Sequence, residues 1–313
     1  METIALRVEA VRREAQDVHS YELCRPDGAA LPPFQAGAHI DLHLPGGLVR
    51  SYSLTNAQTE RHRYVVAVAL DAGGRGGSRW VHERLHVGAR LSVGAPRNHF
   101  PLHEDAPHSV LIAGGIGITP LRAMQARLAE LGRSWELHYA CRSPARAAFA
   151  DEWKAPGAPA RLYLGDQAGG RLDIARTVQA APAGAHFYCC GPQAMLQAFE
   201  AATAALPAER VHLERFGAPQ APAVQGGFVV ELARSGRRLP VAPGATILDT
   251  LLAHGIDAPY SCMQGICGAC ETRVLDGQPE HRDGVLNQAE RAANRTMMVC
   301  CSGARSPVLL LDL

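Results

Sequence analysis

The sequence predicts a multidomain protein in which an antiparallel β-barrel, an α/β domain with a parallel sheet and a small C-terminal β domain follow one another. Up to about residue 100, short segments of alternating apolar and polar residues are broken by Gly and Pro, as in antiparallel barrels. From Ser109 onward, apolar strands alternate with helical segments, which indicates a parallel sheet covered on both faces. Five of the nine cysteines crowd into residues 262–301, a pattern that favours a metal site over a disulfide framework.

Length and charge narrow the class of protein. The 313 residues suit two or three domains of roughly 100–150 residues each. The net charge of +1 argues against a nucleic-acid partner, because such proteins usually concentrate Lys and Arg on one face. No apolar run reaches the roughly 18 residues of a membrane-spanning helix, and the N-terminus has no apolar signal core. We therefore expect a cytoplasmic protein with no nucleic-acid and no membrane partner.

The barrel is expected to have six strands. They are Ile4–Ala10, Val18–Leu23, His39–Leu44, Leu48–Leu54, Tyr64–Leu70 and Arg90–Val93. The fourth strand carries side chains that together can serve a flavin. The guanidinium of Arg50 suits a phosphate, the ring of Tyr52 suits the isoalloxazine, and the hydroxyl of Ser53 suits a ring heteroatom. An ordinary barrel strand would explain the same residues.

A glycine-rich loop, Gly73-Gly74-Arg75-Gly76-Gly77-Ser78-Arg79, precedes a helical segment at Trp80–Leu85. Such a loop presents free N–H groups and the positive end of the helix dipole to a phosphate, which predicts Gly76, Gly77 and Ser78 as binding residues. A flexible hairpin loop is the alternative. With the preceding Arg-x-Tyr-Ser strand, this loop resembles the flavin-binding barrel of the ferredoxin reductase superfamily, in which the strand contacts the flavin and the loop takes its phosphate.

The α/β domain begins with a strand at Ser109–Ala113, a glycine turn and a helix at Leu121–Leu131. The turn departs from G-x-G-x-x-G at its last position, where a Pro suits the first turn of a helix. On a parallel sheet such a turn binds a dinucleotide pyrophosphate. The residues predicted to do so are Gly115, Gly117, Thr119 and Pro120. Further strands are expected at Trp135–Tyr139, Arg161–Leu164, Ala185–Cys189 and Val211–Leu213, and helices at Ala145–Trp153, Asp173–Gln179 and Gln193–Ala205.

A second strand end meets a helix start at Cys190-Gly191-Pro192. Ligands of parallel sheets bind outside the carboxyl ends of the strands, so this turn is expected beside the first one. In the ferredoxin reductase superfamily a Cys-Gly-Pro turn lies next to the nicotinamide, and these three residues match it. A buried structural cysteine is the alternative reading of Cys190.

Arg142, after the second strand of the α/β domain, is a candidate for contact with the nucleotide. An Arg followed by a Ser in this place can bind the 2′-phosphate of NADPH. Arginines there are also common as solvated or diphosphate-facing groups. The residues themselves therefore leave NADH and NADPH open.

Cys262, Cys267 and Cys270, followed by Cys300 after 29 intervening residues, match the plant-type ferredoxin spacing of a [2Fe–2S] cluster. Three thiolates so close in sequence require a tight loop with little side-chain bulk, which its two glycines supply. Such a loop also directs backbone N–H groups at the sulfurs. A zinc site is the alternative, although zinc ribbons prefer paired Cys-x2-Cys knuckles and only one such pair is present.

Cys301 is adjacent to Cys300 and chemically equal to it. Neighbours along a strand point to opposite faces, so only one of the two is expected to be a ligand, and the spacing favours Cys300. The remaining cysteines are scattered and read as small buried side chains. They are Cys24, Cys141, Cys189 and Cys190.

The segments around the cysteines form a small mixed pattern. Phe228–Leu232 and Arg238–Val241 read as a hairpin, and Thr246–His254 reads as a helix with Thr246 as N-cap. Further strands are expected at Thr272–Leu275, Met297–Val299 and Val308–Leu311. This pattern resembles the β-grasp ferredoxin domain over residues 226–313.

Taken in order, these motifs resemble the phthalate dioxygenase reductase and vanillate O-demethylase reductase family over essentially the whole chain. The resemblance implies a flavin-binding β-barrel at 1–102, an NAD-binding domain at 103–217, a linker at 218–226 and a ferredoxin domain at 227–313. It also implies FMN as the flavin and NADH as the donor.

The same resemblance assigns roles to single residues. Cys190 and Ser53 match positions at the catalytic centre. In the phthalate-type enzymes an aromatic residue just past the last strand of the NAD domain lies against the flavin, which makes Phe216 a candidate; a packing residue at the domain junction is the alternative.

The activity implied is electron transfer from NADH through FMN and the [2Fe–2S] cluster to a Rieske-type non-haem iron oxygenase or demethylase that acts on an aromatic compound. One alternative is a reductase for another acceptor, such as a haem mono-oxygenase or a soluble ferredoxin. Another is a non-catalytic flavin and iron–sulfur redox sensor. The charged run Glu280-His281-Arg282-Asp283 near the cluster loop is either part of a docking face or solvated charge.

Overall fold

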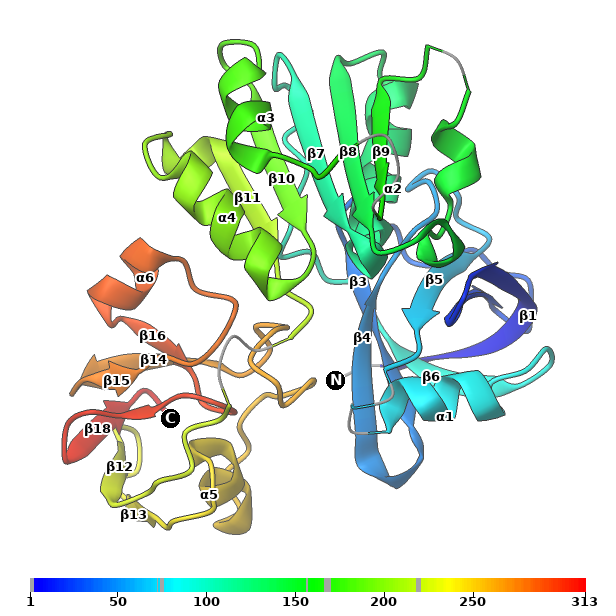
Figure 1. The fold of residues 1–313 in the computed structure, drawn as a ribbon. Helices are drawn as coiled ribbons and strands as arrows, with labels where there is room; N and C mark the ends of the chain where they lie inside the picture. The colour runs from blue at the N-terminus through cyan, green and yellow to red at the C-terminus, as the bar shows by residue number, and fades with distance from the viewer. Residues whose placement is uncertain (1–2, 72, 74–75, 156, 166–169, 218–220) are drawn as a thin grey trace. The chain divides into compact units, whose positions relative to one another are not determined.

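The computed structural model describes residues 3–71, 73, 76–155, 157–165, 170–217 and 221–313. The chain divides into two compact units, one that ends at Glu214 and one that runs from Arg215 to Leu313. The first unit contains an antiparallel and a parallel sheet, and the second contains a mixed sheet, as Figure 1 shows along the chain. No helix among these residues is long and apolar enough to cross a membrane.

The antiparallel sheet has six strands in the order β4-β3-β6-β1-β2-β5. They are β1 (Thr3–Ala15), β2 (Val18–Cys24), β3 (His39–Leu44), β4 (Leu48–Ser53), β5 (Tyr64–Ala69) and β6 (Arg90–Gly94). The two end strands meet at a bridge between Leu54 and Val66, and the N–H of Thr55 donates to the carbonyl of Val65 at 2.8 Å. This contact closes the sheet, so the predicted barrel and its six strands are confirmed.

Alternation along the strands builds the barrel core. On β3, Ile40 and Leu42 join the buried apolar cluster, whereas His39 and Asp41 lie on the opposite face. Helix α1 (Gly77–Arg84) adds Val81 to the same core. This helix begins at Gly77, inside the glycine-rich loop, and so earlier than predicted.

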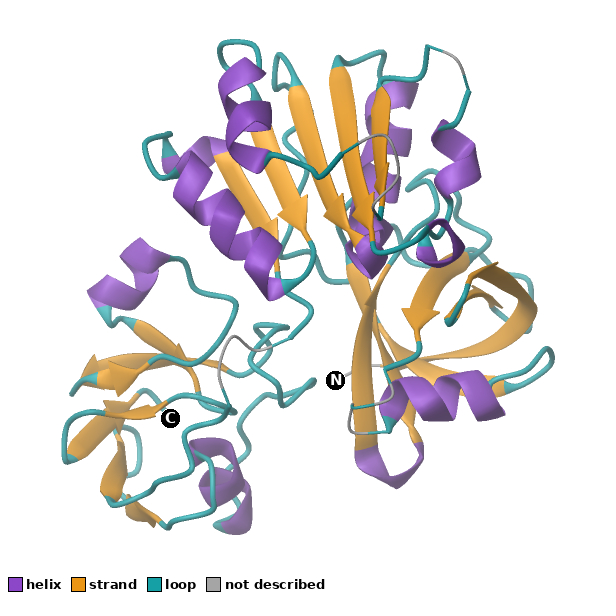
Figure 2. Ribbon diagram, in the orientation of Figure 1, coloured by secondary structure: helices purple, strands orange, loops and turns teal. Residues whose placement is uncertain are grey.

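The parallel sheet has five strands in the order β11-β10-β7-β8-β9. They are β7 (Ser109–Gly114), β8 (Trp135–Cys141), β9 (Ala160–Leu164), β10 (His186–Cys190) and β11 (Val211–Glu214), and its helices are α2 (Ile118–Glu130), α3 (Ile174–Ala180) and α4 (Gln193–Thr203). Figures 1 and 2 show α3 and α4 on one face of the sheet and α2 on the other. The predicted doubly covered sheet is confirmed.

The central strand β7 contributes apolar side chains to the cores on both faces of the parallel sheet. Val110 and Ile112 belong to one buried cluster with Phe199 of α4, and Leu111 belongs to a different one with Leu121 of α2. A strand that is apolar on both sides is what a parallel sheet between two helix layers requires.

The helix predicted at Ala145–Trp153 is wrong. The structure has two short 3-10 turns instead, Pro144–Arg146 and Ala150–Trp153. Phe149, between them, has a φ of 61°, a left-handed conformation that interrupts helical hydrogen bonding. Its ring is buried, and the guanidinium carbon of Arg122 lies 4.7 Å from the ring centre. A tertiary contact therefore overrides the local helix propensity.

The second unit contains a mixed sheet in the order β13-β12-β18-β14-β16 and a two-stranded sheet, β15-β17. The strands are β12 (Phe228–Leu232), β13 (Arg238–Val241), β14 (Glu271–Asp276), β15 (Pro279–Glu280), β16 (Thr296–Met298), β17 (Gly303–Ala304) and β18 (Val308–Leu311), and the helices are α5 (Ile247–Ala253) and α6 (Gln288–Ala293). Strands β12 and β18 pair in parallel and the other neighbours pair antiparallel. The predicted mixed fold is confirmed.

Helices α5 and α6 of the second unit both start with a capping box, but only α5 was predicted from the sequence. The hydroxyl of Thr246 accepts from the N–H of Asp249 at 3.1 Å, and the Asp249 carboxylate accepts from the N–H of Thr246, so the predicted N-cap of α5 is part of a capping box. Helix α6 has the same device at Asn287, but none of its residues is buried, so no apolar period marked it in the sequence.

A stack of aromatic rings lies beside the parallel sheet. The ring centre of His212 on β11 is 4.6 Å from that of His103 and 4.6 Å from that of Tyr188 on β10. Its Nε2 lies 3.1 Å from Nδ1 of His186. Burial, together with the neighbouring imidazoles of His103 and His186, lowers the pKa of His212 to about 4. The folded protein therefore disfavours a charged His212.

We expect the free energy of unfolding of the first unit to fall as the pH drops from about 6.5 to about 4. In this window the unfolded His212 takes up a proton and the folded one does not. The stabilisation is present above pH 6.5 and lost by pH 4, so His212→Gln should reduce the loss by about 2 kcal/mol, allowing for solvent screening.

Urea unfolding followed by tryptophan fluorescence measures this, because all three tryptophans lie in the first unit. His62→Gln, at an exposed histidine, serves as control and should keep the wild-type pH slope. An unchanged slope in His212→Gln would contradict the prediction.

Candidate functional site

The second unit brings the predicted cysteine quartet together. Cys262, Cys267 and Cys270 lie in the loop between α5 and β14, and Cys300 lies in the turn between β16 and β17. None is more than 3% exposed. The fold therefore carries the distant fourth cysteine to the loop that holds the other three.

Backbone N–H groups of the loop point at the sulfurs. Sγ of Cys262 accepts from the N–H of Gln264 at 3.3 Å, and Sγ of Cys267 accepts from the N–H of Cys262 at 3.4 Å. Sγ of Cys300 accepts from the N–H of Gly265 at 3.2 Å. Donors in this arrangement stabilise thiolates and the negative charge of a metal cluster.

The four thiols interact in two pairs, Cys262 with Cys267 and Cys270 with Cys300. Hydrogen bonds from Cys270 and Cys301, followed by the N–H of Gly265, lower the pKa of Cys300 to about 4. Two pairs fit a two-iron cluster, in which each iron takes two thiolates.

Cys300 and Cys301 do not lie on a strand, so the expectation that strand alternation points them to opposite faces is wrong. Strand β16 ends at Met298, and both cysteines lie in the turn that follows, where the N–H of Cys301 donates to the Met298 carbonyl at 3.2 Å. Cys300 nevertheless faces the loop N–H of Gly265, whereas Cys301 is fully buried and its Sγ lies 3.8 Å from the Met298 oxygen. Cys300 as the fourth ligand stays a prediction, which now rests on this orientation.

In the first unit, the two predicted nucleotide turns are in direct contact. A Cβ on Gly117 would collide with the carbonyl of Cys190. A Cβ on Gly114 would lie 2.5 Å from Cδ of Pro192, and Gly191 lies 3.1 Å from Gly114 by the same measure. The turns after β7 and β10 therefore meet at the carboxyl ends of neighbouring strands, as predicted for a dinucleotide site.

Helix α2 starts beside these turns, and its first N–H, that of Ile118, donates to the carbonyls of Gly115 and Ile116. No side chain caps α2 at Gly117. Thr119 is buried and its hydroxyl donates to the carbonyl of Ile116 at 2.9 Å, which fixes the turn, and Pro120 is buried in the first turn of the helix. Gly115, with a φ of 54°, has open space where a side chain would be. These residues fit a pyrophosphate, and their contact with one remains a prediction.

Cys190 is fully buried, and burial, with Glu214 next, raises the pKa of its thiol well above the usual value. The cysteine is therefore a neutral thiol at the turn. Glu214, opposite Cys190 in the parallel ladder, was missed by the sequence analysis. Its Oε2 is buried with no hydrogen-bond partner among the described residues, and burial raises the pKa of the carboxyl to about 8. An acidic residue at the end of the strand that follows the Cys-Gly-Pro turn was the sequence signal that could have found it.

Arg142 is exposed at the carboxyl end of β8. The nearby Arg146 is held by the first unit itself, because its guanidinium donates to the carboxylate of Asp17 at 2.8 Å. Arg142 thus remains the predicted nucleotide contact on this edge.

The predicted flavin strand presents its three side chains on two faces. Arg50 and Tyr52 pair with the core positions Leu42 and Ile40 of β3, whereas Ser53 pairs with His39 on the other face. Burial raises the pKa of the Tyr52 phenol to about 12.

Ser53 has the unmet hydrogen bond that a flavin heteroatom would satisfy. The residue is 4% exposed, and its Oγ has no partner among the described residues. Leaving a buried hydroxyl without a partner costs stability, which the structure tolerates where a ligand supplies the bond.

The glycine-rich loop packs closely against the side chain of Arg50. A Cβ on Gly77 would lie 2.6 Å from Nε and 2.7 Å from Cγ of Arg50, so the arginine side chain lies directly over the start of α1. Gly76 is the N-cap with a φ of 84°, and no side chain caps the helix. The hydroxyl of Ser78 accepts from the N–H of Asp71 at 3.0 Å, which shapes the loop. A guanidinium over free helix N–H groups fits a phosphate, although Gly74 and Arg75 lie outside the described residues.

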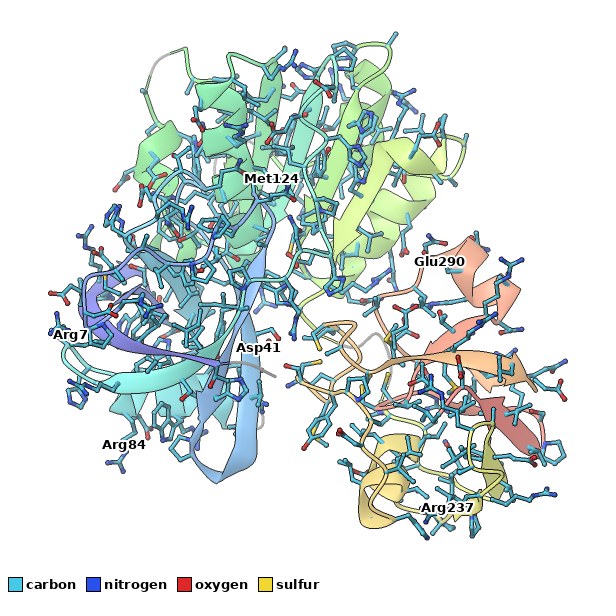
Figure 3. All side chains as sticks on the ribbon, turned by 180° about the vertical axis from the view of Figure 1, so that it is seen from behind. Arg7, Asp41, Arg84, Met124, Arg237 and Glu290 are labelled. Carbon is cyan, nitrogen blue, oxygen red and sulfur yellow. The ribbon has the colours of Figure 1, made fainter. Side chains whose placement is uncertain are left out.

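A buried polar group on β3 lies next to this strand and was missed by the sequence analysis. Asp41, labelled in Figure 3, accepts from the hydroxyl of Ser51 at 2.6 Å and from the guanidinium of Arg97 at 2.6 Å. Nε2 of the buried His39 has no partner among the described residues, and burial lowers the pKa of His39 to about 4. Alternating polar residues in His39–Leu44 were the only sequence signal.

Phe216 is 40% exposed and lies just past β11, in the second unit. Its contact with the flavin remains a prediction. The domain limits at 102 and 217 and the linker at 218–226 also remain predictions, and residues 218–220 lie outside the described part.

We expect Gly77→Ala to weaken FMN binding about tenfold, or 1.4 kcal/mol, because the added methyl group displaces Arg50 from the helix start. Titration of the apoprotein with FMN, followed by quenching of flavin fluorescence, measures the change. Gly73→Ala, in the same loop, is the control, because its Cβ would meet nothing closer than 3.8 Å. Equal affinities for the two variants would show that the Arg50 contact is not part of the site.

We expect Cys300→Ser to abolish the iron–sulfur cluster and Cys301→Ser to retain it, because Sγ of Cys300 accepts the N–H of Gly265, whereas Sγ of Cys301 lies 3.8 Å from the Met298 oxygen. Iron and acid-labile sulfide per chain, with the visible spectrum, report the cluster. Loss of the cluster in Cys301→Ser alone would reverse the assignment.

Two family models match the chain. The model described as "2Fe-2S iron-sulfur cluster binding domain" matches residues 230–305, and the model described as "Oxidoreductase NAD-binding domain" matches residues 111–201. The first covers the cysteine quartet, and the second covers both nucleotide turns.

Curated relatives match over the full length. Phenoxybenzoate dioxygenase subunit beta of Ectopseudomonas oleovorans is 55% identical, over 100% of this chain and 98% of that protein. Tetrachlorobenzoquinone reductase of Sphingobium chlorophenolicum is 53% identical, over 99% and 98%. Vanillate O-demethylase oxidoreductase of a Pseudomonas species (strain HR199 / DSM 7063) is 43% identical, over 99% and 100%.

Solved structures of related proteins also match nearly the whole chain. Phthalate dioxygenase reductase matches with 38% identity and a TM-score of 0.76, over 99% of this chain and 98% of that one. An intact type IV self-sufficient cytochrome P450 monooxygenase matches with 42% identity and a TM-score of 0.86, and there the chain spans 41% of the longer protein. The chain belongs to the phthalate dioxygenase reductase and vanillate O-demethylase oxidoreductase family, as its motifs predicted.

Proposed function

We propose that the protein is the reductase component of a Rieske-type oxygenase or demethylase system that acts on aromatic compounds. It passes electrons from NADH through FMN and a [2Fe–2S] cluster to that oxygenase. The observation that carries the proposal is the presence, in one chain, of a cysteine quartet in two pairs, two nucleotide turns in contact and a barrel strand with an unpartnered buried hydroxyl.

The three cofactor sites together convert a two-electron donor into a one-electron donor. A nicotinamide gives up two electrons as a hydride, whereas an iron–sulfur cluster takes one electron at a time. A flavin held on β4 supplies the conversion between the two. The role of this chain is to hold the three groups and to tune their surroundings.

On the nucleotide side, the start of α2 with Gly115 and Gly117 binds the pyrophosphate, and Thr119 and Pro120 fix the helix that presents those N–H groups. The turn from Cys190 to Pro192 positions the nicotinamide. Because the Cys190 thiol is buried and neutral, it contributes shape rather than a nucleophile.

On the flavin side, Arg50 and the N–H groups of Gly76, Gly77 and Ser78 bind the phosphate, and Tyr52 and Phe216 contact the ring. The hydroxyl of Ser53 donates to a ring heteroatom, which meets its own unsatisfied bond. FMN in place of FAD, and NADH in place of NADPH, follow from family membership.

The acceptor is inferred from the relatives. They bear names of a dioxygenase subunit and of demethylase oxidoreductases. A haem mono-oxygenase is the second candidate acceptor, because the reductase part of a self-sufficient cytochrome P450 is 42% identical to this chain. We place the protein in the cytoplasm, where reducing conditions suit nine free cysteines.

We expect the purified holoprotein to contain FMN, iron and sulfide, and to reduce both cytochrome c and ferricyanide with NADH far faster than with NADPH. Steady-state assays with an extracted-flavin analysis measure this. Cys262→Ser should lose most cytochrome c reduction and keep ferricyanide reduction, because ferricyanide accepts electrons from the flavin directly. A holoprotein that reduces neither acceptor would favour the redox sensor.

Mixing the reductase with purified oxygenases distinguishes the acceptors. Support of turnover by a Rieske-type oxygenase, and not by a haem mono-oxygenase, is the expected result. The reverse result would move the protein to the second candidate.

A further inference from the structure

The charged run Glu280-His281-Arg282-Asp283 was expected at the surface as docking or solvated charge, and for Asp283 this is wrong. Its side chain is 0% exposed. A fully buried carboxylate is costly unless its surroundings stabilise it, so its place in the fold requires a reason. That place is directly behind the cysteine loop.

The contact between Asp283 and the loop runs through Gly265. A Cβ on Gly265 would lie 3.1 Å from Cα and 3.4 Å from Cβ of Asp283. The carbonyl of Gly265 accepts from the N–H of Gly284 at 2.7 Å, and its N–H donates to Sγ of Cys300 at 3.2 Å. Gly265 therefore contacts both Asp283, at its Cα and Cβ, and the sulfur of a predicted cluster ligand.

Two backbone N–H groups and one guanidinium lie around the carboxylate of Asp283. Oδ2 accepts from the N–H groups of Val285 and Leu286 at 3.0 and 2.8 Å, and the guanidinium of Arg291 lies 3.7 Å from the same oxygen. Oδ1 has no hydrogen-bond partner among the described residues, and Nδ1 of His281, 3.9 Å away, has none either.

The guanidinium of Arg291 is the counter-charge. One of its terminal nitrogens donates to the backbone carbonyl of Asp283, while its Nε is buried without a partner among the described residues. The arginine comes from α6, the helix on which Figure 3 labels Glu290, and its side chain is 32% exposed. Solvent therefore screens the arginine more than it screens the buried carboxylate.

We propose that Asp283 is a potential-setting residue: its buried negative charge holds the reduction potential of the [2Fe–2S] cluster low, and Arg291 partly offsets it. Reduction adds one electron, hence one negative charge, to a cluster that is already anionic with four thiolates. A fixed carboxylate on a residue packed against Gly265 disfavours that electron, because net charge and surroundings set the potential of such clusters. The inference rests on the proposed function, since it needs the cluster on the cysteine quartet.

Asp283→Asn tests it with little change in shape, because the amide oxygen can still accept from the N–H groups of Val285 and Leu286. We expect the variant to be easier to reduce, with the equilibrium constant for one-electron reduction raised about tenfold, or 59 mV for a one-electron couple. Arg291→Gln removes the counter-charge and should shift the potential the opposite way, by less than tenfold because the arginine is partly solvated.

The measurement is a redox titration of the purified holoprotein followed by the electron paramagnetic resonance signal of the reduced cluster. Glu290→Gln is the control, because it removes an exposed carboxylate of α6 while the glutamine can still complete the capping box of that helix. Its potential should match that of the wild type.

Opposite shifts in the Asp283 and Arg291 variants support the inference. An unchanged potential in Asp283→Asn, or shifts of the same sign in both variants, would overturn it and leave Asp283 as a turn-forming residue. If Asp283→Asn fails to assemble a cluster, the sign of the Arg291→Gln shift decides. A wild-type protein with no reducible cluster would overturn the proposed function as well, so the two failures are distinguishable.

Discussion

A methyl group cannot be accommodated at Gly77, Gly117 or Gly265 without moving a group of a candidate site. Each glycine lies where the chain must come closer to a neighbour than a Cβ permits: Arg50 at the flavin strand, the Cys190 carbonyl at the nucleotide turns, and Cys301 with Asp283 behind the cysteine loop. These three close contacts lie where we propose the flavin phosphate, the nicotinamide and the cluster to bind. The rest of the fold supports them, since the barrel, the parallel sheet and the mixed sheet each hold one such contact on rigid strands.

Several buried polar atoms near the candidate sites have no hydrogen-bond partner among the described residues. Ser53 Oγ, His39 Nε2, Glu214 Oε2 and Asp283 Oδ1 are all buried and unpartnered among the described residues. Groups of this kind are normally eliminated because each costs stability. Here Ser53 lies on the predicted flavin strand and pairs with His39, Glu214 pairs with Cys190, and Asp283 packs against Gly265 of the cysteine loop. Proteins keep such polar groups near sites for ligands or for electrostatic control.

The two units favour opposite charge states at their candidate sites. Near the nucleotide turns, burial keeps Cys190 as a neutral thiol and favours the protonated carboxyl of Glu214, so these two groups add little net charge beside the turns. Around the cysteine loop, backbone N–H groups and hydrogen bonds favour charged sulfur. Asp283 works against those donors, and the balance between the two sets the energy of the added electron.

The sequence alone determined the architecture and most of the motifs. Strand alternation gave all six barrel strands, the strand–helix succession gave the parallel sheet, and the cysteine spacing gave the quartet, because periodicity and spacing are local properties. The tertiary structure decided what local patterns cannot encode. Phe149 leaves its expected helix for a contact with Arg122, the turn after Met298 separates Cys300 from Cys301, and Asp283 lies buried behind a loop 18 residues away in sequence. Each outcome depends on which distant residues share a space, and that information appears only when the chain has folded.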